Sequence, residues 1–196
     1  MARSHSVCPQ FHLPVQSGND KVLREMNRVY TRAHYLERVR ALRQAIPEVG
    51  LTTDVIAGFP GETQEDFAQL CRLVEEGRFD RLGCFAYSPE EDTPAAEMEG
   101  QLDEQLKIRR AEIVTEEQMN IMAQQNEKKV GQTVTVVTGG FDRFGECYFG
   151  RSEADAPDID GKIFFTSEKK LSVGDFVKVA LEDTLDLDLI GSVVED

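Results

Sequence analysis

The sequence predicts an α/β protein in two parts: about three parallel β-strands with their helices, followed by a small OB-like antiparallel β-barrel. Up to about residue 87, helical and strand patterns alternate, which is typical of right-handed crossovers and a parallel sheet. After Gly131, short β-rich runs alternate with turn residues, which favours a small closed barrel. We expect the first domain, with a linking helix, at residues 1–128 and the second at residues 129–196.

The beginning of the chain is predicted to hold one strand and two helices. Residues 11–16 favour a short strand, and Asp20 is expected to cap a brief helix that runs through Met26. A longer helix begins at the Thr31 cap and ends before Pro47, because apolar side chains recur there at helical spacing. These apolar residues are Leu36, Val39, Leu42 and Ile46.

Two further strands, at residues 51–57 and 81–87, flank a third helix. Thr63 begins this helix, with Asp66 three residues later in a capping-box-like arrangement. Its buried stripe consists of Phe67, Leu70, Cys71 and Val74. Because three strands do not complete a parallel domain, we expect the first strand to leave an open edge that a segment outside this chain pairs.

The second part of the chain is expected to follow a long linking helix. Residues 103–129 follow an acidic loop, are polar and contain neither glycine nor proline, which predicts that helix. The five β-rich runs after it are residues 133–138, 146–150, 162–166, 176–181 and 187–194. Turns between them are predicted at Gly139-Gly140, Pro157, Gly161 and Val173-Gly174-Asp175.

Charge and composition restrict the classes of function. The chain has 36 acidic and 22 basic residues, a net charge of −14, which opposes contact with a nucleic-acid backbone and favours a basic partner. No apolar run approaches the roughly 20 residues of a membrane helix, and the polar N-terminus does not resemble a secretion signal, so a cytoplasmic location is expected. The four cysteines lack metal-binding spacing, and Cys71 and Cys84 fall at apolar positions.

Residues 54–63 run from a strand through a glycine turn into a helix. Gly58 and Gly61 lack a Cβ where the backbone must bend or approach a ligand, and Glu62 lies beside a helix N-terminus, where a negative charge is favoured. Taken alone, this segment is an ordinary βα turn.

A second segment, residues 12–20, places polar side chains at the end of the first predicted strand. Gln16 and Ser17 fall at the carboxyl end of that strand, and their amide and hydroxyl groups can donate or accept hydrogen bonds. The alternative is that Ser17 only caps the following helix, and for Asp20 the cap is the favoured interpretation.

Two later segments are also distinctive. Residues 79–89 read Phe-Asp-Arg-Leu-Gly-Cys-Phe-Ala-Tyr-Ser-Pro and are followed by Thr-Pro-Ala-Ala at residues 93–96, and by themselves their aromatic residues would be sheet core. Residues 150–161 read Gly-Arg-Ser-Glu-Ala-Asp-Ala-Pro-Asp-Ile-Asp-Gly, in which the aspartates also suit turns.

Taken in order, these segments resemble the radical-SAM methylthiotransferases, over roughly residues 10–195. Residues 54–62 are similar to the signature G-x-I-x-G-x-x-G-E, with Asp54 in place of the first glycine, and residues 12–20 are similar to H-x-P-x-Q-S-G-x-D. Residues 79–89 and 150–161 are closest to the RimO type, the latter within its TRAM domain.

The resemblance implies half of a (β/α) radical-SAM barrel followed by a TRAM domain. It implies S-adenosylmethionine as cofactor, held by Gln16, Ser17, Asp54, Ile56, Gly58, Phe85 and Tyr87. It implies substrate contacts from Arg151, Asp155, Asp158 and Asp160. No catalytic residue and no metal ligand is assigned to this chain.

The activity implied is methylthiolation of the β-carbon of an aspartate in a small-subunit ribosomal protein. S-adenosylmethionine would be both the methyl source and the source of a radical that abstracts hydrogen from that carbon. The 4Fe-4S clusters this requires are held by cysteines that the family places in an N-terminal segment, which we expect upstream of Met1. The chain alone is therefore expected to be inactive, with that segment of the same enzyme as its partner.

The predicted second domain is acidic, with 7 basic and 14 acidic residues from Lys129 onward, a net charge of −7. This favours a basic ribosomal protein and disfavours nucleic acid as the direct substrate. Two alternatives stay open. One is a transfer-RNA methylthiotransferase of the MiaB-like class, which residues 26–31 also resemble, and the other is a non-catalytic module that only docks substrate.

Overall fold

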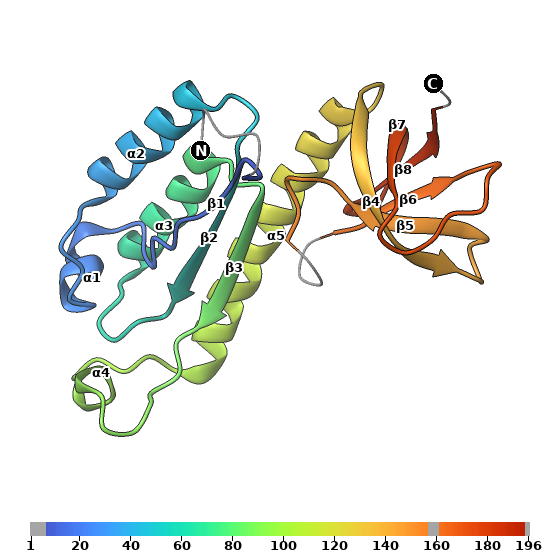
Figure 1. Cartoon of the computed structure of the whole chain (residues 1–196). Coiled ribbons are helices and arrows are strands. Elements are labelled where there is room, and N and C mark those ends of the chain that lie inside the picture. The colour runs from blue at the N-terminus through green and yellow to red at the C-terminus, as the bar shows by residue number, and fades with distance from the viewer. Residues whose placement is uncertain (1–6, 157–160, 195–196) are drawn as a thin grey trace. The chain divides into compact units, whose positions relative to one another are not determined.

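A computed structural model describes residues 7–156 and 161–194 (Figure 1). The described residues form two compact units: residues 11–121 make one, and residues 122–194 with residues 7–10 make the other. No helix in the described ranges is long and apolar enough to cross a membrane.

The first unit is built on a parallel sheet with the strand order β1-β2-β3. Its strands are β1 (Gln10–His12), β2 (Gly50–Ala57) and β3 (Arg81–Ala86). The first strand is shorter than the predicted residues 11–16, because Pro14 has no N–H to donate and Gln16 adopts a φ of 71°. The chain returns to the sheet at Gln16, through a single parallel bridge to Val55.

Five helices accompany this sheet: α1 (Asp20–Glu25), α2 (Arg32–Ala45), α3 (Gln64–Gly77), α4 (Pro94–Glu97) and α5 (Glu104–Lys129). The predicted caps at Thr31 and Thr63 are confirmed, the latter with a complete capping box to Asp66. The cap predicted at Asp20 is wrong. Asn19 has the extended backbone of a cap and accepts from the N–H groups of Lys21 and Val22, whereas Asp20 accepts from the Arg32 N–H.

Alternation along β2 gives the sheet one closed and one open face. Leu51, Val55 and Ala57 are buried in a core with residues of α2, α3 and α5. Asp54 and Ile56 point to the opposite face and are only partly buried. A binding surface on this sheet therefore has to lie on the face that carries Asp54 and Ile56.

The second unit is a closed barrel with the strand order β4-β5-β6-β8-β7. Its strands are β4 (Thr133–Asp142), β5 (Cys147–Arg151), β6 (Ile163–Thr166), β7 (Phe176–Leu185) and β8 (Asp188–Val193). Their inward side chains form a separate core of Val136, Ile163, Phe165, Val179, Leu181 and Leu189. The β-rich runs read from the sequence are thus strands of one barrel.

Two details of this barrel differ from the prediction. It is not purely antiparallel, because β6 and β8 pair in parallel. A closed ring of five strands has an odd number of neighbour pairs, so strand directions cannot alternate all the way round. In addition, Gly139-Gly140 is not a turn but lies inside β4 at a register shift, where a Cβ on Gly140 would come within 2.6 Å of the Phe149 ring.

Candidate functional site

The turn that follows β2 requires glycine. Gly58 has a φ of 79° and Gly61 a φ of 74°, a region that side chains disfavour. A Cβ on Gly58 would also lie 2.4 Å from Cγ of Lys107, whereas one on Gly61 would meet nothing within 4 Å. Helix α5 therefore packs directly on the first residue of the turn.

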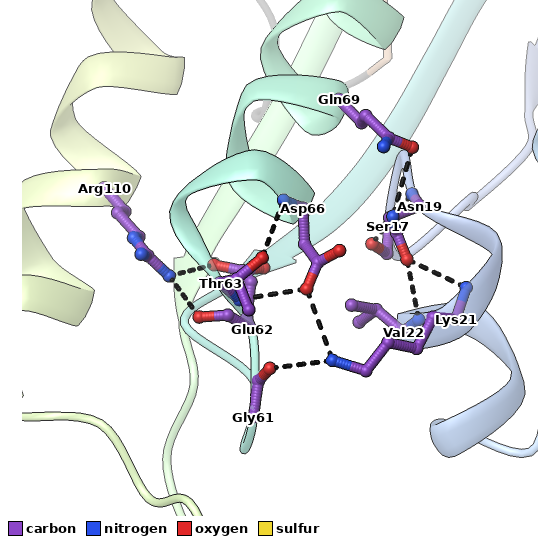
Figure 2. Close-up of polar contacts among 10 residues, drawn as sticks. All are labelled: Ser17, Asn19, Lys21, Val22, Gly61, Glu62, Thr63, Asp66, Gln69 and Arg110. Atoms are coloured by element: carbon purple, nitrogen blue, oxygen red, sulfur yellow. Dashed lines mark hydrogen bonds and ion pairs between the residues drawn. The ribbon is translucent and has the colours of Figure 1, made fainter.

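Glu62 closes this turn from the inside. Its side chain is 1% exposed and pairs with Arg110 at 2.8 Å. Glu62 Oε1 also accepts from the Gly58 N–H at 2.9 Å. Arg110 donates to the carbonyl of Glu62 at 3.0 Å, as Figure 2 shows. Burial raises the pKa of Glu62, while the Gly58 hydrogen bond and the Arg110 charge act in the opposite direction. The sequence motif pointed to Glu62 but not to Arg110, which lies 48 residues away.

A second set of contacts joins the turn to helix α1. Lys21 Nζ donates to the Gly61 carbonyl at 3.0 Å and lies 3.4 Å from Asp66 Oδ2 (Figure 2). Burial acts to raise the pKa of Asp66, but hydrogen bonds from Thr63 and the charge of Lys21 outweigh it, so the pKa is lowered. The amide of Asn19 reaches Gln69 on α3 at 3.1 Å. The segments after β1 and after β2 are thus bound together at the carboxyl ends of their strands.

The open face of the sheet brings together residues from β2 and β3. The register sets Asp54 beside Gly83 and Ile56 beside Phe85. Phe85 is 58% exposed, and a Cβ on Gly83 would lie 2.7 Å from Asp54 Oδ1. This face therefore presents a carboxylate next to one aliphatic and one aromatic side chain, with the space beside the carboxylate kept free by a glycine.

Asp54 has a partner that the sequence did not reveal. His12 Nε2 lies 3.2 Å from Asp54 Oδ2, and His12 Nδ1 lies 2.8 Å from Thr52 Oγ1. The three side chains come from β1 and β2, so only strand pairing shows that they are neighbours. His12 holds the carboxylate in place on the open face.

The other predicted cofactor residues differ in whether they adjoin the open face or are buried. Gln16 lies beside β2, because its N–H donates to the Asp54 carbonyl and its carbonyl accepts from the Ile56 N–H. Ser17 is 1% exposed and its Oγ accepts from the Asn19 N–H. Tyr87 is 7% exposed and packs edge-on against Phe59. Gln16 thus adjoins the open face, whereas Ser17 and Tyr87 are buried near its end.

The predicted substrate residues lie at and after the end of β5. Arg151 is the last residue of that strand and is partly exposed. Asp155 Oδ2 accepts from the N–H of Ser152 at 3.0 Å and from its hydroxyl at 2.6 Å, which makes a local turn. Asp158 and Asp160 lie outside the described residues, as does the turn predicted at Pro157.

The described residues do not fit an iron-sulfur cluster. Such a cluster needs several cysteine thiolates at one place, but within residues 7–156 and 161–194 no three His, Cys, Asp or Glu side chains gather to hold a metal. The cysteines are free, and burial raises the pKa of Cys71, and that of Cys84 to about 12, which opposes the thiolate form. The open face fits an adenosyl cofactor better, since it offers an aromatic ring, an aliphatic side chain and a carboxylate.

Comparison with known proteins gives two family matches. Residues 1–74 match the Radical SAM superfamily and residues 130–194 match the TRAM domain. The chain is thus a radical-SAM segment followed by a TRAM domain, in agreement with a partial parallel sheet and a closed five-stranded barrel.

Curated relatives narrow this class. The chain is 40% identical over 189 residues to "Ribosomal protein uS12 methylthiotransferase RimO" of Clostridioides difficile (strain 630), which covers 96% of the chain and 42% of the relative. Proteins of the same name from Pelotomaculum thermopropionicum and Bdellovibrio bacteriovorus are 43% and 42% identical, over 99% and 97% of the chain and 44% and 42% of each relative. The chain thus matches a portion of the RimO-type radical-SAM methylthiotransferases over nearly its whole length, and it spans less than half the length of the curated relatives it matches.

Proposed function

We propose that the chain is part of an enzyme that adds a methylthio group to the β-carbon of an aspartate in a small-subunit ribosomal protein. The observation that carries this proposal is the similarity to relatives named as uS12 methylthiotransferases, which extends over 96% to 100% of the chain at about 40% identity. The open sheet face beside the glycine turn supports it, because it offers one place for the cofactor of that chemistry.

S-adenosylmethionine would be held on the open face of the sheet. Bound there, it would supply the methyl group and the radical chemistry of the reaction. The Asp54 carboxylate, oriented by His12, accepts hydrogen bonds from an ammonium or ribose hydroxyl group. Ile56 and Phe85 would offer apolar surface to the adenine ring, and Gly83 leaves room beside Asp54.

The remaining residues of the proposed site act at its end. Gln16, which pairs with β2 beside Asp54 through a single bridge, would approach the cofactor from that side, and Gly58 would let the backbone come close. Ser17 and Tyr87 are buried, so we assign them to shaping this end of the site rather than to its open surface.

The iron-sulfur chemistry belongs to another segment in this proposal. Because the described residues do not fit a cluster, we propose that the ligands of the cluster come from a part of the enzyme outside this chain. We also propose that the enzyme acts in the cytoplasm. We therefore expect the 196-residue chain to be inactive alone. Iron, sulfide and methylthiolation activity in the purified chain would overturn this expectation.

The TRAM domain, with its boundary at residues 128/129, is proposed to receive the substrate. Arg151 and Asp155 lie at one end of β5, and Asp158 and Asp160 follow in the sequence. An excess of acidic over basic residues in this domain suits a protein rich in lysine and arginine.

Substrate binding can be tested directly with two probes. We expect the chain to bind purified uS12 and to bind transfer RNA much more weakly, with affinity for uS12 falling as salt is raised. Anisotropy titrations at several salt concentrations measure both. Preferential binding of transfer RNA would reject the ribosomal substrate and favour the MiaB-like alternative.

Cofactor binding is tested by calorimetry with S-adenosylmethionine. Asp54→Asn and Phe85→Ala should each weaken binding by about tenfold, because each removes one contact worth about 1 to 2 kcal/mol. His34→Gln is the matched control, since the exposed His34 side chain lies on α2 and accepts from Arg38 of the same helix. Equal affinity in the Asp54 and Phe85 variants would place the cofactor elsewhere.

A further inference from the structure

A buried ion pair joins the turn after β2 to helix α5. The Glu62 side chain is 1% exposed and the Arg110 side chain 5%, with 2.8 Å between Oε1 and Nη1. Arg110 lies beyond residues 1–74, which match the Radical SAM superfamily, and it belongs to none of the sequence motifs. Its partner Glu62 is the last residue of the glycine-turn motif.

Stability alone does not account for this pair. Removing two charges from water is costly, and apolar side chains of similar volume often replace a buried ion pair without loss of stability. A second buried atom, Glu62 Oε2, has no hydrogen-bond partner among the described residues, so the carboxylate is not fully compensated. A role in fixing the geometry of the turn therefore explains the pair better.

The hydrogen bonds of the pair indicate that role. Glu62 Oε1 accepts from the Gly58 N–H. The Arg110 nitrogen that pairs with Glu62 Oε1 also donates to the Glu62 carbonyl at 3.0 Å (Figure 2). One guanidinium thus fixes the last residue of the turn directly and the first residue through the carboxylate.

The guanidinium is itself fixed by its surroundings. It lies 5.2 Å from the centre of the Phe67 ring on α3, in a cation–π contact. One turn earlier on α5, Lys107 packs against Gly58, where a Cβ would come within 2.4 Å of Cγ. The turn cannot shift toward α5, and Arg110 prevents it from shifting away.

We propose that Arg110 is a positioning residue. Through Glu62 it fixes the turn at residues 58–62, at the end of the open face. The identity of the ligand rests on the proposed function. The position of the turn does not depend on that ligand, so the proposed function and this inference can fail separately.

The position of the turn is tested by amide hydrogen exchange in the full 196-residue chain, measured by NMR. In Arg110→Gln, exchange of the Gly58 N–H should accelerate by about tenfold relative to the β2 amides, because its acceptor loses the partner that holds it. Arg110→Lys keeps the charge without the guanidinium fork and should restore part of the protection. Arg109→Gln, which removes an exposed arginine that pairs with Glu112 at 3.3 Å, should change nothing.

Affinity for S-adenosylmethionine is the second readout. Arg110→Gln should weaken binding by about tenfold, and the double variant with Glu62→Gln should be no worse than the more affected single variant, because the two residues act as a unit. If the unmodified chain does not bind S-adenosylmethionine, the cofactor proposal fails while Gly58 exchange still decides the role of Arg110. If Arg110→Gln does not fold, Arg110→Lys and Glu62→Gln carry the comparison. Unchanged Gly58 exchange relative to β2 in these folded variants overturns the inference.

Discussion

Two glycines in one turn show how differently single residues of the same type are constrained. Gly58 and Gly61 both have positive φ angles, of 79° and 74°. Only Gly58 is also in close contact, with Lys107 Cγ 2.4 Å from the position of a Cβ. The backbone conformation thus sets a common cost for any side chain, and packing against α5 adds a second cost at Gly58 alone.

The variant Gly58→Ala should therefore destabilise the first unit more than Gly61→Ala. We expect about 1 to 2 kcal/mol for Gly61→Ala from the left-handed backbone alone. We expect about 1 to 3 kcal/mol more for Gly58→Ala from overpacking. Urea unfolding of both variants measures the difference. Equal losses would mean that α5 yields freely to a methyl group.

The cysteines allow a chemical prediction at the same scale. Cys8 is exposed, whereas burial raises the pKa of Cys84 to about 12. Because the thiolate is the reactive form, Cys84 should be alkylated by iodoacetamide far more slowly than Cys8 in the native chain at neutral pH. Peptide mass spectrometry over time gives both rates, and unfolding in urea is the control that should make them similar. Comparable native rates would contradict the buried position of Cys84.

At the scale of elements, the sequence predicts a helix start where the signal lies in residues close together. It does not decide between two adjacent residues that both suit a cap. Thr63 and Asp66 identify a helix start by their spacing alone, because a capping box needs only residues close in sequence. Asn19 and Asp20 are adjacent and both suit a cap, so sequence could not decide that Asn19 takes the position. Gly139-Gly140 has turn composition but lies in β4 at a register shift, where the Phe149 ring leaves no room for a Cβ on Gly140.

The capping box gives helix α3 a pH-dependent start. The pKa of Asp66 is lowered in the folded chain, so its contribution to stability is present above the pKa of the unfolded state and is lost as pH falls through the lowered folded value. Asp66→Asn should cost about 1 kcal/mol at pH 7 and progressively less in acid. Urea unfolding at a series of pH values measures this, with Glu65→Gln as the exposed control on the same turn. A cost independent of pH would show that the charge of Asp66 does not contribute.

At the scale of the whole molecule, the sequence predicted which strands exist, but only in part how they pair. The parallel sheet followed from alternating helices and strands, and the barrel from closely spaced β-rich runs. The parallel β6–β8 pair and the contact of His12 with Asp54 both depend on residues brought together across the fold. Motif positions thus named Asp54, Ile56 and Phe85, and the motif at residues 12–20 includes His12. The pairing of His12 with Asp54 and the contact of Arg110 with Glu62 came only from three-dimensional contacts.

The C-terminal unit offers a prediction about where an independently folding domain begins. The barrel has its own core, yet Asn126 on α5 is 1% exposed and donates to the Leu187 carbonyl at 2.8 Å. A fragment of residues 122–196 should therefore unfold cooperatively and be more stable than residues 130–196 by about 1 kcal/mol or more, because the shorter fragment leaves that carbonyl unpaired. Urea unfolding followed by circular dichroism compares the two, and Asn126→Ala in the longer fragment should remove most of the difference. If the fragments were equally stable, the last turns of α5 would contribute nothing to the barrel, and the domain would begin at β4.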